Sequence, residues 1–269
     1  MNVSEKEWRE LHKAAVRDYH GRLRAWAEQN GVPLNPRGRI PTAFHERYLQ
    51  ATGDDITDIL AEIERLRPPR TPTAYDYLTG PEWRHFLEAA SFSLIWVDRI
   101  SASECLRKLT WLHPVLGGPA PLEQVMSRAV PPPGDILGAA EIGEWTLLYM
   151  PDNGGSGAVM PMAERLSADD HHAVAYWQIA AIGKERFMYW RGGELRTEFD
   201  PIFPNDRRGS QPDLLVPQMT DAGLLPVDDP GDWPRDHALK ALDLADRITN
   251  GAHAGPDVIS GPFLWSAPR

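Results

Sequence analysis

The chain has 269 residues, of which 42% are hydrophobic and 25% are charged, and its formal net charge is −10. This balance is typical of a soluble globular protein with one large domain, or a small domain beside a larger one. No apolar run is long enough to span a bilayer, and the first ten residues lack a signal-peptide core, so we expect neither a membrane protein nor a secreted one. The single cysteine, Cys105, excludes an internal disulfide framework and fits a reducing cytoplasm.

The charge is unevenly distributed along the chain. Residues 1–70 hold 12 Lys and Arg against 11 Asp and Glu, whereas residues 71–269 hold 16 against 27. Residues 17–47 alone carry six arginines and three acidic residues. An acidic body with one basic segment argues against a protein wrapped by nucleic acid, but it permits a small module that contacts phosphate.

Residues 1–66 are predicted to form a small all-α module. Ser4 and Glu7 have the spacing of a capping box, and apolar residues at helical spacing follow them. The Asn-Gly pair at 30–31 is a typical helix stop. Gly21 is expected to weaken or break this first helix, because glycine costs more backbone entropy in a helix than other residues do.

Two further helices are predicted in the same module. The second begins at Pro41, a favoured first helical residue, and ends at Gly53. The third follows the acidic pair at 54–55. Its apolar stripe is too short for an independent coiled coil, so we expect it to pack onto the module through residues 56, 59, 60, 63 and 66.

Residues 67–73 contain three prolines and are predicted to be a stiff linker and a domain boundary. Residues 74–269 are predicted to be an α+β domain with a mainly antiparallel sheet of about five strands. Helices are expected at 81–90, 101–109 and 236–251, and an extended loop with a short helix at 113–143. Segments rich in branched and aromatic residues predict the strands, at 92–97, 145–150, 173–182, 186–190 and 194–199.

The segment "NPRGRIP" at 35–41 carries the sharpest functional signal. Arg37 and Arg39 flank Gly38, whose missing Cβ lets the backbone approach a surface closely while both side chains spread. The minor groove of A·T-rich DNA is narrow and concentrates negative potential, which favours inserted guanidinium groups. Its acceptor pattern distinguishes A·T from G·C but little more. The segment therefore predicts a minor-groove loop, although a basic turn in solvent is the plain alternative.

Other residues are predicted to position this loop on the phosphate backbone. The start of the second helix directs free N–H groups at a phosphate, and nearby arginines add contacts. The predicted DNA-binding residues are therefore Arg37, Gly38, Arg39, Arg24, Arg22, Arg47 and Thr42.

The ordered set "LRAWAEQNG", a short spacer and "RGRIP" resembles the DNA-binding domain of the actinobacterial H-NS-like nucleoid silencers, over about residues 15–53. The resemblance implies that the Arg-Gly-Arg segment enters the minor groove, that Arg24 supports it on the backbone, and that Trp26 is a core residue. Pro36 departs from the small polar residue usual in the family, which removes an auxiliary phosphate contact. The family's separate oligomerisation domain is missing, so filament-style silencing is not implied.

The segments "FLEAASFSLIWVDRISASECLRKL", "WTLLYMP" and "FDPIFPNDRRGSQPDLLVPQM" resemble an uncharacterised domain common in streptomycetes and their relatives. The resemblance covers about residues 83–225 and has no activity to carry over. Within this domain, the "DDHH" segment at 169–172 and the glycine-rich segment at 152–158 lack the spacing of metal or phosphate motifs, and are predicted to be a turn and a hairpin or lid. Cys105 is predicted to be a buried apolar residue. The charged loop at 199–213 is predicted to satisfy its own ion pairs at a sheet edge, the alternative being a binding surface. No catalytic residue, metal ligand or cofactor is assigned.

Together these features predict a cytoplasmic, nucleoid-associated protein that binds A·T-rich double-stranded DNA through its N-terminal module. The larger domain would sense, recruit or regulate, with a protein partner or a small ligand. Two alternatives stay open. One is an enzyme with its active site in residues 80–269, localised on DNA by the module. The other is an interaction module whose basic loop docks an acidic partner.

Overall fold

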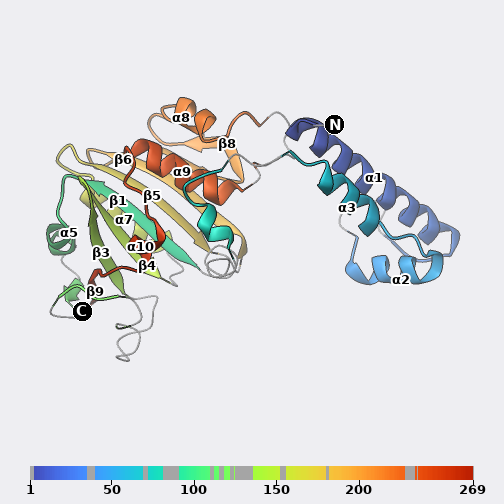
Figure 1. The fold of residues 1–269 in the computed structure, drawn as a ribbon, viewed down its shortest axis with the longest axis horizontal. Helices are drawn as coiled ribbons and strands as arrows, with labels where there is room; N and C mark the ends of the chain where they lie inside the picture. Colours follow the sequence, from blue (N-terminus) through green and yellow to red (C-terminus); the bar gives the residue numbers. More distant parts are fainter. Residues whose placement is uncertain are drawn as a thin grey trace. The chain divides into compact units, whose positions relative to one another are not determined.

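The computed structural model divides the chain into two compact units, residues 1–71 and 72–269. Figure 1 shows the helices and strands of both units. The linker predicted at 67–73 stays a prediction, and residues 69–71 lie outside the described part of the chain. The structure describes residues 3–34, 40–68, 72–80, 91–109, 112–114, 118–121, 124, 136–151, 156–179, 182–227, 234 and 236–268.

The first unit begins with a long helix, α1 (Glu5–Gln29). Ser4 caps it as predicted, because its hydroxyl accepts from the Glu7 backbone N–H while the Glu7 carboxylate accepts from the Ser4 backbone N–H. The helix ends at Asn30, and Gly31 follows with a φ of 62°, a conformation that favours glycine. The break expected at Gly21 is wrong: α1 is continuous through it.

The other two helices of this unit are α2 (Thr42–Thr52) and α3 (Thr57–Arg65). Pro41 is the residue before α2 rather than its first residue, and Gly53 ends the helix in the left-handed conformation. Asp55 precedes α3 and accepts a hydrogen bond from the Thr57 backbone N–H at 2.9 Å. The predicted order of three helices is therefore present, with small shifts of their ends.

The core of the first unit lies between α1 and α2. Tyr19 and Leu23 of α1 and Tyr48 of α2 are buried there, together with Ile40. The third helix attaches less completely than predicted. The Trp8 indole N–H donates to the Ile63 carbonyl at 3.0 Å, but Ile59 remains 45% exposed.

Within its described residues, the second unit is built on one nine-stranded sheet in the order β2-β9-β3-β4-β1-β5-β6-β7-β8, and its neighbouring strands pair antiparallel. The predicted α+β class is thus confirmed. The strands are β1 (Phe92–Asp98), β2 (Leu112–Pro114), β3 (Leu137–Ile142), β4 (Trp145–Pro151), β5 (His172–Ile179), β6 (Lys184–Arg191), β7 (Glu194–Asp200), β8 (Phe203–Arg208) and β9 (Leu264–Pro268).

Helices cover both faces of this sheet (Figure 1). One apolar layer packs against α8, α9, α10 and the short helix η1, and the other against α5 and α7. The central strand β1 is buried along its whole length, because alternate residues such as Trp96 and Val97 enter opposite layers. The helices are η1 (Asp76–Thr79), α5 (Ala102–Lys108), α7 (Ser156–Leu166), α8 (Val216–Asp221), α9 (His237–Ile248) and α10 (Pro256–Ile259).

Several sequence predictions for this unit need correction. The sheet has four strands more than the five predicted, and β3 occupies the end of the expected loop at 113–143. The expected hairpin or lid at 152–158 is wrong for its last three residues, which begin α7, while 152–155 lie outside the described residues. The helix expected at 81–90 also lies outside them.

Candidate nucleic-acid interface

The segment 35–39, with Arg37, Gly38 and Arg39, lies outside the described residues. The residues on either side of it are described. Ile40 is 5% exposed in the core of the first unit, and Leu34 packs against the same core. The residues at both ends of the segment therefore contact one core, formed by α1 and α2.

Arg22 is held by carboxylates. Its Nε donates to Oδ2 of Asp54 at 2.8 Å and its Nη2 to Oδ1 of the same residue at 3.2 Å. Asp18, one turn earlier in α1, is a further ion-pair partner, and the Tyr48 hydroxyl donates to Asp54 at 2.5 Å. Arg22 thus ties α1 to the end of α2, a geometry that favours a structural role over the phosphate contact predicted for it.

Arg47 and Thr42 are exposed on α2. Among the described residues, no carboxylate lies within ion-pair distance of Arg47. Arg24 is half-buried on α1, close enough to His20 for its charge to act on that imidazole. The three residues therefore differ in environment, and Arg47 is the most available for an external anion.

The N-terminus of α2 has no capping side chain among the described residues and no acidic residue in its first turn. Ordinarily the first N–H groups of a helix are satisfied by such a cap, as Ser4 does for α1. The positive end of α2 thus begins just after the basic segment and is suited to an anion.

Two histidines between α1 and α2 were missed by sequence reasoning. The ring of His45 stacks on Tyr19 with 5.7 Å between centroids, and lies 5.6 Å from the ring of His20. Burial lowers the pKa of His20, and the charges of His45 and Arg24 lower it further. Their spacing of 25 residues carries no motif, so only the packing of the two helices brings them together.

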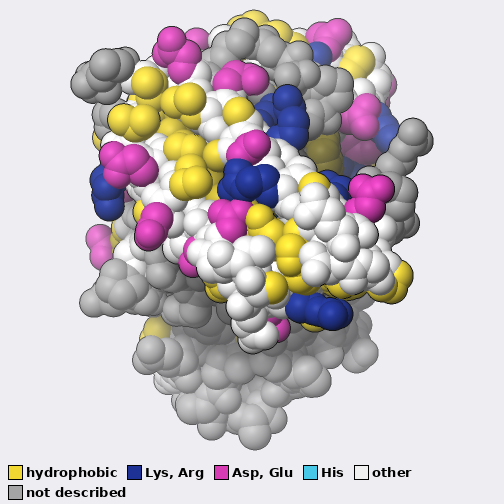
Figure 2. All heavy atoms as spheres, turned by 90° about the vertical axis from the view of Figure 1, so that its right-hand side faces the viewer, with side chains coloured by type: hydrophobic (Ala, Val, Ile, Leu, Met, Phe, Trp, Pro, Cys, Tyr) yellow, Lys and Arg dark blue, Asp and Glu magenta, His cyan; other side chains and the backbone are white. Residues whose placement is uncertain are grey.

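On the described part of the face seen in Figure 2, basic and acidic side chains are interspersed, with apolar side chains between them. The described side chains on this face form no broad basic surface. The described side chains on this face would therefore attract an anion only weakly, so attraction of an anion would depend mainly on the basic segment 35–39.

The residues considered for chemistry in the second unit have structural roles. Cys105 is fully buried, and burial raises the pKa of its thiol to about 12, so it is a poor nucleophile. In the "DDHH" segment, His171 lies 3.1 Å from the Asp98 carbonyl, whereas His172 lies 2.9 Å from the Tyr189 hydroxyl. Among the described residues, no group of three or more His, Cys, Asp or Glu side chains could hold a metal.

The charged loop at 199–213 contains strand β8 at the sheet edge, which the sequence did not predict. One of its ion pairs is internal, as predicted, between Arg207 and Asp213 at 2.9 Å, whereas Asp200 pairs with Arg186 of β6 at 3.5 Å. Arg207 also donates to the Pro204 carbonyl at 2.7 Å. Asp200 accepts from the Ile202 backbone N–H at 3.0 Å. The loop is thus braced partly by its own charges and partly by Arg186.

The chain forms two units, the first of them helical, and residues 15–51 match the model of the Lsr2 DNA-binding domain. Residues 70–257, well over half of the chain, match a family of unknown function (DUF6461), and the chain belongs to that family. Both resemblances seen in the sequence are confirmed. Neither a curated protein nor a solved structure matches the chain significantly. None of the described helices is both long and apolar enough for a bilayer crossing.

Proposed function

We propose that the protein binds A·T-rich double-stranded DNA by inserting Arg37 and Arg39 into the minor groove, while the second unit senses, recruits or regulates at that site. It would act at the nucleoid, in the cytoplasm. The observation that carries the proposal is the anchoring of segment 35–39 at both ends, by Leu34 and Ile40, in a core matched by a DNA-binding family.

Anchoring matters because a groove-inserting loop loses less conformational entropy when its ends are already fixed. The pair Arg22 and Asp54 supports the same preorganisation, since it joins α1 to the far end of α2. We therefore assign Arg22 a bracing role in the module, and leave the groove to the two arginines of the loop.

Phosphate contacts would fix the depth and orientation of the loop. Arg47 is exposed, and the N-terminus of α2 at Thr42 lacks a side-chain cap. Both can meet a phosphate beside the groove. Arg24 is the third candidate, on the support that the resemblance gives it.

The net charge of the second unit disfavours DNA binding, because residues 71–269 hold 27 acidic residues against 16 basic ones. It would be repelled by the backbone and stay clear of the duplex. A single small module then supplies the affinity, so we expect a Kd of about 1 μM or weaker at physiological salt.

Fluorescence anisotropy of the full-length protein, with matched A·T-rich and G·C-rich duplexes at several salt concentrations, tests the proposal. We expect tighter binding to the A·T-rich duplex at every salt concentration, and affinity that falls as salt rises. Equal binding to both duplexes would contradict minor-groove recognition. Absence of binding to either would favour the docking of an acidic protein partner.

A further inference from the structure

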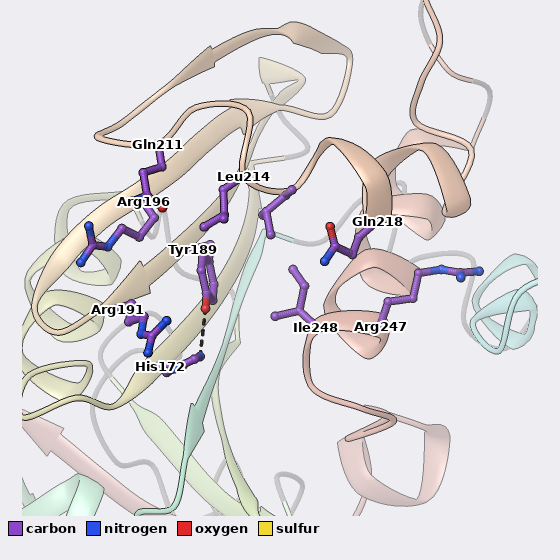
Figure 3. Close-up of a pocket in the computed structure, with 10 residues that line it drawn as sticks. His172, Tyr189, Arg191, Arg196, Gln211, Leu214, Gln218, Arg247 and Ile248 are labelled. Carbon is purple, nitrogen blue, oxygen red and sulfur yellow. Dashed lines mark hydrogen bonds between the residues drawn. The ribbon is translucent and has the colours of Figure 1, made fainter.

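The second unit contains a cavity of about 400 Å³ between the sheet and the helices α8 and α9. Its walls come from β5, β6 and β7, from the loop before α8, and from α9 (Figure 3). Tyr189 stands in the middle of this space, and the side chains of Gln218 and Ile248 point toward it. The size is within the range of small-molecule sites.

A β-bulge places a cation in this wall. Tyr189 pairs with Thr197 and Trp190 pairs with Leu195, so Arg196 is the extra residue between the two pairs. Bulges of this kind redirect a side chain and are common beside functional sites. Arg196 lines the cavity, on the face of the sheet opposite to its neighbour Leu195, which packs into the other layer.

The bulge is locked from behind. The backbone N–H groups of Ser210 and Gln211 donate to the carbonyls of Leu195 and Arg196 at 3.1 and 2.8 Å. Gly209 has a φ of 112°, and a Cβ there would lie 2.4 Å from the Arg196 carbonyl oxygen. Position 209 therefore has a backbone conformation that only glycine adopts readily. This conformation lets the loop pack against the strand that carries Arg196.

The lining is basic although the unit is acidic. Among the described residues, three arginines and a histidine line the cavity and no carboxylate does. Arg191 lies beside His172, while the guanidinium of Arg247 points away from Tyr189 (Figure 3). The carboxylates that pair with Arg191 and Arg196 are Asp170, at 3.8 Å, and Glu194, at 2.7 Å, and both are more than half exposed.

Two lining polar atoms are buried without a hydrogen-bond partner in the described part of the chain, Nε of Arg196 and Oε1 of Gln218. A buried polar group without a partner costs free energy, so each is a candidate contact for a ligand. Leu214, Leu215 and Ile248 supply apolar surface around them. Leu214 is 43% exposed, as expected for a residue at an opening.

We infer that this cavity binds a small organic anion, a carboxylate or a phosphate attached to an apolar body such as an aromatic ring. Arg191 and Arg196 would hold the acidic group, and the apolar body would lie against Tyr189 and Leu215. This inference deepens the sensing role proposed for the second unit, and it is independent of DNA binding.

The test uses the full-length protein without DNA and the fluorescent anion 1-anilinonaphthalene-8-sulfonate as probe. We expect saturable binding, weaker binding of the uncharged analogue N-phenyl-1-naphthylamine, and displacement of the probe by benzoate, phenyl phosphate or both. The stronger competitor identifies the acidic group. Non-saturable binding, or equal affinity for the charged and uncharged probes, would overturn the inference, as would displacement by neither competitor.

Variants locate the site. Arg196→Met and Arg191→Met should each lower the affinity for the anionic probe about tenfold, as expected for one lost charge-assisted hydrogen bond. Arg107→Met removes an equal charge from an exposed ion pair on α5 and should change nothing. Gln218→Glu adds a negative charge to the wall and should lower the affinity for the anionic probe but not for the uncharged one. This variant keeps the test decisive if an arginine variant fails to fold. If Arg196→Met and Gln218→Glu both fold and bind the probe like Arg107→Met, the site is elsewhere and the inference is wrong.

Discussion

The guanidinium of Arg22 holds the Asp54 carboxylate through two hydrogen bonds, and so joins the middle of α1 to the residue that follows the turn after α2. The Tyr48 hydroxyl shares the same carboxylate. The Asp54 carboxylate thus accepts hydrogen bonds from both helices that flank the basic segment.

Replacing Asp54 with Asn should lower the melting temperature of the first unit by a few degrees at neutral pH. The hydrogen bonds from Arg22 and then Tyr48 lower the pKa of Asp54. A carboxylate with a lowered folded pKa stabilises above its unfolded pKa and loses that contribution as pH falls through the folded value. The wild type and Asp54→Asn should therefore converge in strong acid, measured by circular dichroism. Glu46→Gln on α2 is the control, and an equal loss in that variant would contradict the assignment.

Ile40 tests the anchoring of the basic segment. Replacing this buried residue with Ala should destabilise the first unit by about 2–4 kcal/mol, because it removes buried methylenes and leaves a cavity. Leu49→Ala, on α2 but 39% exposed, should cost much less. Urea denaturation followed by helical circular dichroism compares the two. Similar losses would mean that the segment's C-terminal end is not fixed by the core.

Arg47→Ala should weaken binding to A·T-rich and G·C-rich duplexes about equally, and lower the salt slope by about one. A phosphate contact carries no base information, so the preference between duplexes should stay. Arg65→Ala removes an exposed arginine that is already paired with Glu62, outside the matched DNA-binding residues, and should have little effect. A change in A·T preference on replacing Arg47 would show that it reaches the bases.

His237 predicts a pH dependence for the second unit. Burial lowers its pKa, but the hydrogen bond and the charge of Glu185 raise it, and the net direction is upward. A raised folded pKa gives stabilisation that is complete below the unfolded value and is lost as pH rises through the folded value. Between about pH 8.5 and about pH 6, the wild type should therefore gain thermal stability relative to Glu185→Gln. Parallel pH profiles for the two proteins would contradict this pairing, which has a length of 2.9 Å.

The elements with strong local signals were predictable. Strands β5, β6 and β7 alternate branched and aromatic residues and are separated by glycine turns, so the meander follows from sequence. Strand β3 reads "LGAAEI", whose small residues have little strand propensity, and its pairing with β4 forms it. Helix α1 continues through Gly21 because the buried residues around it, Tyr19 and Leu23, pack against α2. Tertiary packing there outweighs the local cost of glycine.

The functional residues also differ in whether the sequence alone could predict them. The basic segment is contiguous, so its residues could be named from sequence, whereas the role of Arg22 depends on a carboxylate 32 residues later. The cavity could not be predicted, because its lining comes from three strands and two helices far apart in the chain. The sequence "ELRTEF" gives no sign of the bulge at Arg196.

The central claim is tested most directly by replacing Arg37 and Arg39 together with Ala in the full-length protein, and measuring the ratio of affinities for A·T-rich and G·C-rich duplexes. The account predicts that this ratio falls to about one, while a double Lys variant recovers affinity but not the full preference, because a compact ammonium is harder to desolvate in a narrow groove than guanidinium. If the double Ala variant keeps the wild-type preference for A·T-rich DNA, the segment is only a basic turn and the minor-groove account is contradicted.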